Sequence, residues 1–166
     1  SIYAAITSKG LPLEVLMSEF NDKLKSLLPT GIFCCVAGID INATRTNAQI
    51  WNSGIPDILV VNSMGGIRHR LPSNHLPLGV VTYDEEEMHV YDVGLGVADN
   101  LYIYSDGLTE AENSHRDMFG QDRFERLLDS DTDQNGRLEN IKTSLREFTE
   151  GAASTDDVSL IEIKRP

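Results

Sequence analysis

The residues best suited to chemistry lie where an apolar strand ends in a carboxylate. The run Leu101–Tyr104 is followed directly by Ser105, Asp106 and Gly107. A strand would hold the Asp106 carboxylate rigidly at the rim of a sheet, and Gly107 would let the backbone turn away sharply. Carboxylates so placed bind hard divalent cations. An Asp at a strand end can equally cap the following turn, so this segment alone leaves both interpretations open.

A second pair of carboxylates precedes the last apolar run of the chain. Asp156 and Asp157 stand immediately before the segment Val158–Ile163, which is expected to be a strand buried on at least one face. Two adjacent carboxylates repel each other unless one is solvated or bound to a cation. A cation site and a solvated loop are therefore the two interpretations of this pair.

Other polar segments of the chain could also bind ions. Residues 131–138 match the opening of an EF-hand calcium loop, but Lys142 occupies the twelfth position, where a bidentate Glu is required, so calcium binding is not expected. The alternative is a polar loop between two helices. Residues 68–70 (Arg-His-Arg) could contact a phosphate or simply face solvent along a strand. No histidine has a partner at zinc-site spacing.

Composition excludes several classes of protein. The chain has 166 residues, enough for one domain with a real core, and a net charge of −12, which argues against nucleic-acid binding. No segment reaches the roughly 20 apolar residues that span a bilayer, and the start lacks the features of a signal peptide. Cys34 and Cys35 are adjacent and are expected to be buried free thiols in a reducing compartment. The start without a methionine is interpreted as that of a piece of a longer protein.

Periodicity predicts the elements that position these residues. Spacings of three and four predict helices over 12–28, 123–128 and 138–148. Apolar runs bounded by turn residues predict strands over 32–40, 47–52, 58–62, 67–71, 88–93, 101–104 and 158–163, with a glycine hairpin turn at 64–66. A helix, a block of short strands, two helices and a final strand predict an α+β domain with antiparallel sheets.

Taken together, these segments resemble a known family. The matching pieces are Tyr-Ser-Asp-Gly-Leu-Thr-Glu-Ala at 104–111, Phe-Gly at 119–120, Asp-Asp-Val-Ser at 156–159, Asn-Ser-Gly-Ile-Pro at 52–56, Leu-Pro-Leu-Gly at 76–79 and a helix with Asn21 at its middle. In this order they resemble the PPM (type 2C) phosphatase superfamily, and within it the bacterial SpoIIE-like branch that includes the RsbU-type regulators.

The resemblance implies a fold, an activity and a site. The fold is a β-sandwich of mainly antiparallel sheets flanked by helices, and the activity is that of a phosphoserine or phosphothreonine protein phosphatase with two Mn²⁺ or Mg²⁺ ions. In such enzymes the ions lower the pKa of a bound water, which attacks phosphorus in line. Asp106 and Asp156 match metal ligands of the family. Asp157 and Gly107 are expected to support these ligands without binding the ions.

The sequence departs from the family pattern in several places. The family's first two metal-binding acids, one of which bridges both ions, belong to segments upstream of Ser1. Residues 1–166 are therefore expected to be a single SpoIIE-like phosphatase domain truncated at its amino-terminal end, and inactive or nearly so in isolation. Ile55 replaces a usual His and Ser159 a usual Thr, neither at a ligand position.

The resemblance also implies partners. The expected substrate is a phosphoprotein such as an anti-sigma-factor antagonist, and the expected context is the cytoplasmic output end of a two-component or similar signalling protein with an upstream receiver or sensor domain. Neither nucleic acid nor a membrane is expected as a partner. The alternative is a phosphatase-fold adaptor that binds a sigma factor or its regulators without turnover. Retention of both Asp106 and Asp156 favours the enzyme, since an adaptor does not need acids that repel each other.

Overall fold

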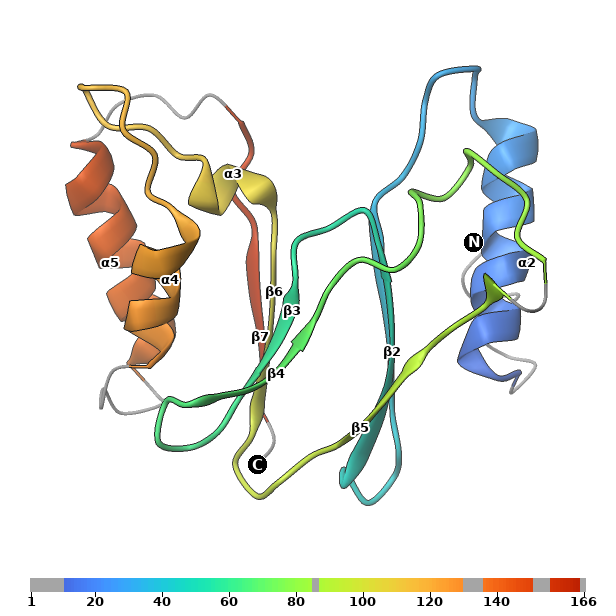
Figure 1. The fold of residues 1–166 in the computed structure, drawn as a ribbon, viewed down its shortest axis with the longest axis horizontal. Helices are drawn as coiled ribbons and strands as arrows, with labels where there is room; N and C mark the ends of the chain where they lie inside the picture. Colours follow the sequence, from blue (N-terminus) through green and yellow to red (C-terminus); the bar gives the residue numbers. More distant parts are fainter. Residues whose placement is uncertain (1–10, 85–86, 130–135, 151–155, 165–166) are drawn as a thin grey trace. The chain divides into compact units, whose positions relative to one another are not determined.

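The structure is a computed structural model that describes residues 11–84, 87–129, 136–150 and 156–164 (Figure 1). The chain forms two compact units, the first from residues 1–55 and 71–95 and the second from residues 56–70 and 96–166. Each unit has its own antiparallel sheet. No helix in the described ranges is long and apolar enough to cross a membrane.

The first unit packs one helix on a three-stranded sheet. Its elements are α2 (Leu13–Leu27), β1 (Val36–Ile41), β2 (Asn47–Ser53) and β5 (Tyr91–Gly94), with strand order β1-β2-β5. The predicted apolar stripe of the helix is confirmed, because Leu13 and Met17 join Trp51 and Leu78 in a buried cluster. Gly38 lets the helix approach β1, since a Cβ atom there would lie 3.0 Å from the Met17 sulfur.

Asn21 ties this helix to a distant loop. Its side chain is 1% exposed, its Nδ2 donates to the Val81 carbonyl at 2.9 Å, and its Oδ1 accepts from the Gly79 backbone amide at 2.9 Å. One amide side chain therefore satisfies two backbone groups of the segment that follows Leu76. The Asn in the middle of the helix has a structural role within the first unit.

Two predictions in this unit are wrong in part. The strand expected over 32–40 begins only at Val36, because Cys34 forms an isolated bridge with Leu78 instead of joining the sheet ladder. The strand expected over 88–93 is the shorter β5. Both cysteines are free, as expected, but Cys34 is only half-buried and Cys35 is exposed. Both cysteines lie outside the sheet, so their side chains are more exposed than the sequence predicted.

An aromatic stack holds the loop between Leu71 and β5. The rings of Trp51 and His75 are parallel within 13° and their centroids are 3.4 Å apart, and Tyr83 meets both rings edge-on. The imidazole Nδ1 lies 3.4 Å from the Asn52 carbonyl and Nε2 lies 3.1 Å from that of Glu87. His75 is 7% exposed, and burial lowers its pKa below 6.5. This histidine is therefore structural.

Acid should destabilise the protein through this histidine. Between about pH 6.5 and the lowered pKa, residue 75 is protonated in the unfolded chain and neutral in the folded chain. The free energy of unfolding therefore falls as the pH drops through this window. Each unit of pH within that window costs at most about 1.4 kcal/mol. Urea unfolding at pH 8, 6.5 and 5 should show a shallower pH dependence for His75→Phe, which keeps a stacked ring. Equal slopes in the two proteins would contradict the assignment.

The second unit covers one face of a four-stranded sheet with helices. Its elements are β3 (Ile58–Val61), β4 (Ile67–Leu71), β6 (Asn100–Tyr104), α3 (Asp106–Thr109), α4 (Gln121–Leu128), α5 (Arg137–Thr149) and β7 (Leu160–Lys164), with strand order β4-β3-β6-β7. Phe124 and Ile141 from the two longer helices pack with Leu59, Tyr102 and Tyr104 from the sheet. The predicted α+β class with antiparallel sheets flanked by helices is confirmed.

The hairpin between β3 and β4 confirms the predicted glycine turn. Gly65 has φ +95°, and its amide donates to the Asn62 carbonyl at 3.1 Å. Its missing side chain also matters, because a Cβ atom would lie 2.9 Å from the backbone at the end of α4. The glycine therefore serves both the turn and the packing of α4 on the hairpin.

Candidate metal centre

Asp106 stands where β6 passes into α3. Strand β6 pairs with β3 up to Tyr102 and with β7 up to Tyr104, so its end beside Asp106 is held by β7. The carboxylate is exposed, and the Gly107 amide donates to its Oδ1 at 3.0 Å. The Asp106 carbonyl accepts from the Glu110 amide at 2.9 Å and from the Thr109 hydroxyl at 3.1 Å. The predicted strand-end carboxylate therefore sits on a fixed backbone.

The segment of Asp156 and Asp157 lies directly against this end of β6. A Cβ atom placed on Gly107 would be 3.5 Å from the Asp156 Cβ atom. The Ser105 hydroxyl donates to the Asp157 carbonyl at 3.0 Å and accepts from the Ser159 amide at 2.9 Å. Backbone segments that are 50 positions apart in sequence are thereby brought side by side.

Gly107 has a different role from the one expected. It is a buried residue of α3 and is not among the glycines with positive φ, so the backbone does not use it for a sharp turn. A Cβ atom at this position would instead lie 2.5 Å from the Asp157 carbonyl oxygen. The missing side chain is what lets the Asp156–Asp157 turn approach α3 so closely.

The side chains here are of the chemical type that binds a hard divalent cation, but they are too few to complete its coordination. Asp106, Asp156 and Asp157 are all exposed, and carboxylate oxygens are the ligands that Mg²⁺ and Mn²⁺ prefer. Such ions take about six oxygen ligands. No group of three or more His, Cys, Asp or Glu side chains in the described ranges is arranged to hold a metal ion. These residues therefore fit part of a metal site.

Ser105 links the two carboxylate segments, a contact that the sequence did not predict. It lies between two segments singled out for other reasons, and its hydrogen bonds to residues 157 and 159 exist only in the folded chain. The one available signal was a hydroxyl residue placed directly before the strand-end carboxylate. That signal indicates a hydrogen bond without indicating its partner.

The two arginines of β4 form ion pairs with acidic side chains. Arg68 forms an ion pair with Asp99, whose side chain is 2% exposed, and Arg70 forms a two-pronged pair with Glu125. The guanidinium of Arg70 lowers the pKa of Glu125, and that carboxylate in turn raises the pKa of Arg70. A phosphate would have to displace these carboxylates, so the two side chains act as structural ion pairs.

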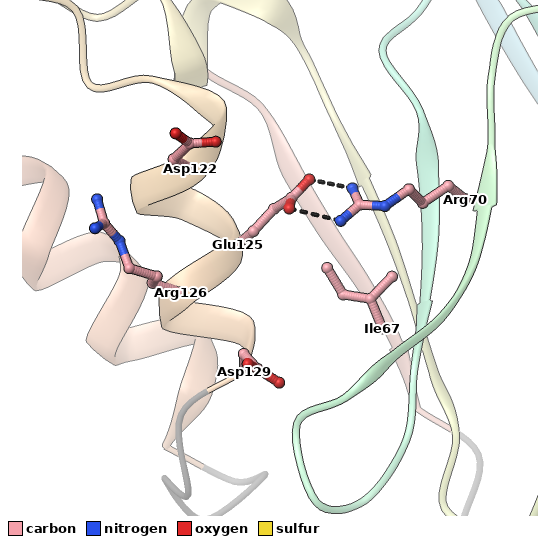
Figure 2. A pocket seen from close by; sticks show the side chains of 6 residues that line it. All are labelled: Ile67, Arg70, Asp122, Glu125, Arg126 and Asp129. Carbon is pink, nitrogen blue, oxygen red and sulfur yellow. Dashed lines mark hydrogen bonds and ion pairs between the residues drawn. The ribbon is translucent and has the colours of Figure 1, made fainter.

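A hollow of about 430 Å³ lies between β4 and α4 of the second unit (Figure 2). Figure 2 shows the Arg70–Glu125 pair crossing it, with Ile67 on one side and Asp122, Arg126 and Asp129 along the helix. None of the predicted metal ligands lines it. The cavity therefore belongs to the packing of α4 on β4.

The calcium-like motif is only partly visible. Residues 131–135 lie outside the described residues. Lys142, at the position that should be a bidentate Glu, is on α5, and its Nζ lies 2.7 Å from the Glu139 carboxylate. With a cation at that position, the expectation that this segment is no calcium site stays a prediction.

Comparisons with known proteins give a consistent result. The sequence matches the family described as stage II sporulation protein E (SpoIIE) over residues 1–166. It is 26% identical over 126 residues to protein IcfG of Synechocystis sp., covering 75% of this chain and 19% of that protein. The chain is thus a small part of the length of that relative.

Similar solved structures share the fold. The SiaA PP2C domain of Pseudomonas aeruginosa aligns with a TM-score of 0.77 at 18% identity, covering 99% of this chain and 66% of that one. The PP2C domain of SpoIIE from Bacillus subtilis, solved with a fragment of its regulatory domain, gives 0.76 at 14% identity, with coverages of 98% and 47%. RsbX in complex with magnesium gives 0.64 at 15% identity, with coverages of 98% and 72%.

Proposed function

Because the chain belongs to the SpoIIE family, we propose that it is a metal-dependent phosphatase domain that removes phosphate from phosphoserine or phosphothreonine of a partner protein in bacterial signalling. The observation that carries the proposal is the juxtaposition of two predicted ligand segments. Gly107 allows Asp106 and the Asp156–Asp157 turn to meet, and Ser105 joins them by hydrogen bonds. A solvated loop would not need this close approach.

The roles of the side chains follow from their chemistry. Asp106 and Asp156 would hold Mn²⁺ or Mg²⁺, while Asp157 and Gly107 would shape the turn beside them. A bound divalent ion neutralises charge on the phosphoryl oxygens and lowers the pKa of water. The RsbX structure contains magnesium, which supports a divalent ion as the cofactor of this fold. Both carboxylates are exposed, as a site open to a phosphoprotein requires.

The domain is proposed to extend beyond residue 1. The described residues offer too few oxygen ligands for two ions, and the chain spans 66% of the SiaA structure it matches. Further acids upstream would complete the site, and residues 1–166 alone are expected to be inactive or nearly so. A covalently linked sensor or receiver domain is proposed from the regulatory domain of the SpoIIE protein. The expected cytoplasmic location stays a prediction.

The proposed substrate is a phosphorylated regulator such as an anti-sigma-factor antagonist. An adaptor that binds the partner protein without turnover is the alternative. Phosphate release from a phosphoserine protein by the complete protein, with and without Mn²⁺, separates the two. Metal-dependent release is expected. Tight binding of the partner without release would establish the adaptor instead.

A further inference from the structure

The Ser105 hydroxyl continues the connection between β6 and β7 beyond the point where their ladder ends. The last paired residues of the ladder are Tyr104 and Leu160. Past them, β6 turns into α3, and the Ser105 amide still donates to the Ser159 carbonyl at 3.0 Å. The hydroxyl then spans to the Asp157 carbonyl at 3.0 Å and the Ser159 amide at 2.9 Å. One residue therefore joins the backbone of Asp106 to that of Asp157.

We propose that Ser105 is a positioning residue of the metal centre, which sets the Asp156–Asp157 turn relative to Asp106 and so raises the affinity for a divalent ion. The inference rests on the proposed function, because it takes Asp106 and Asp156 as the ligands. Ser105 does not bind the ion. Its effect passes through the backbone that carries the ligands, and supporting groups of this kind typically change metal affinity by about 10- to 100-fold.

The chemistry of the site requires a hydroxyl. The side chain donates one hydrogen bond and accepts another, and a single short group can do both only if it is a hydroxyl or, more weakly, a thiol. Alanine would leave the Asp157 carbonyl and the Ser159 amide to water. Ser105 is only half-buried, so water can reach these groups and the fold should persist. What is lost is the fixed distance between the two ligand segments.

The contact at Gly107 does not replace this hydrogen bonding. It is a close approach that limits how near the turn can come, and it has no directional attraction. Hydrogen bonds have preferred distances and angles, so they fix a position more narrowly than contact does. The hydroxyl is therefore expected to decide the register of the two carboxylates, while the glycine provides the room.

The test compares Ser105→Ala with Ser105→Thr in the complete protein. Mn²⁺ affinity is measured by calorimetry, and thermal unfolding is followed without metal. We expect Ser105→Ala to weaken Mn²⁺ binding about tenfold with a small change in the unfolding temperature, and Ser105→Thr to bind like the wild type. Ser114→Ala is the matched control, because its hydroxyl bonds to Glu150 on the surface and should leave Mn²⁺ affinity unchanged. If the alanine variant fails to fold, Ser105→Cys should show intermediate affinity.

The outcomes separate this inference from the proposed function. Wild-type Mn²⁺ affinity in Ser105→Ala or Ser105→Cys, combined with lost affinity in Asp106→Ala, overturns the positioning role alone. Unchanged affinity in both Asp106→Ala and Asp156→Ala overturns the metal site itself, and the role of Ser105 with it. Weakened affinity in Ser105→Thr equal to that in Ser105→Ala also contradicts the proposal, since the hydroxyl would then be irrelevant.

Discussion

Replacing Asp106 or Asp156 by Ala in the complete protein is expected to lower Mn²⁺-dependent phosphate release by at least about a hundredfold. Hydrolysis of a phosphoserine monoester needs charge neutralisation on the phosphoryl oxygens and an activated water at neutral pH, and divalent ions supply both. Losing one carboxylate removes ligand oxygens from the proposed site. The measurement is initial rate against Mn²⁺ concentration on a phosphoserine protein.

The same substitutions should not lower the thermal stability of the metal-free protein. Without metal, the exposed acids at the end of β6 repel each other, so either substitution should leave the unfolding temperature unchanged or slightly raised. Asp40→Ala is the matched control, because Asp40 is an exposed acid on β1 in the other unit. Its rate should equal that of the wild type. Full activity in Asp106→Ala would remove this residue from the site, and an equal loss in Asp40→Ala would point to a non-specific charge effect.

Gly107→Ala is expected to disturb the site through the backbone. The new Cβ atom would lie 2.5 Å from the Asp157 carbonyl oxygen, and backbone cannot rotate away as a side chain can. Overpacking costs about 1–3 kcal/mol, while removing a glycine from a helix returns roughly 0.5–1 kcal/mol. We therefore expect a net loss of about 1 kcal/mol of unfolding free energy, a displaced Asp156–Asp157 turn and weaker Mn²⁺ binding.

Gly94→Ala provides the control for this substitution. Gly94 ends β5, and a Cβ atom there would meet nothing within 4 Å. Urea unfolding and Mn²⁺ calorimetry on both variants should show the loss of stability and affinity only for Gly107→Ala. Wild-type values for Gly107→Ala would show that the turn moves freely and that the close approach has no function.

The elements of this protein could be predicted from the sequence because their signals are local. The apolar spacing of α2 and the glycines of the β3–β4 turn act over a few residues, so the helix and the hairpin were found within one or two positions. Boundaries were less certain where distant residues decide them. The first strand begins at Val36 because Cys34 pairs with Leu78, more than 40 positions away. The helical turn α3 was missed, since its four residues are stabilised by contacts with the Asp157 segment and the core.

The candidate site divides in the same way. The sequence by itself determined which carboxylates stand beside strands. The family resemblance carried by 104–111 and 156–159 assigned these carboxylates to one metal site. Only the tertiary structure decided that these ends meet, that Gly107 serves close approach and not a turn, and that Ser105 joins the two segments. It also decided that Arg70 is occupied by Glu125. These facts depend on the path of the chain between distant positions, because a hydrogen bond or a steric contact acts only over a few ångströms in space.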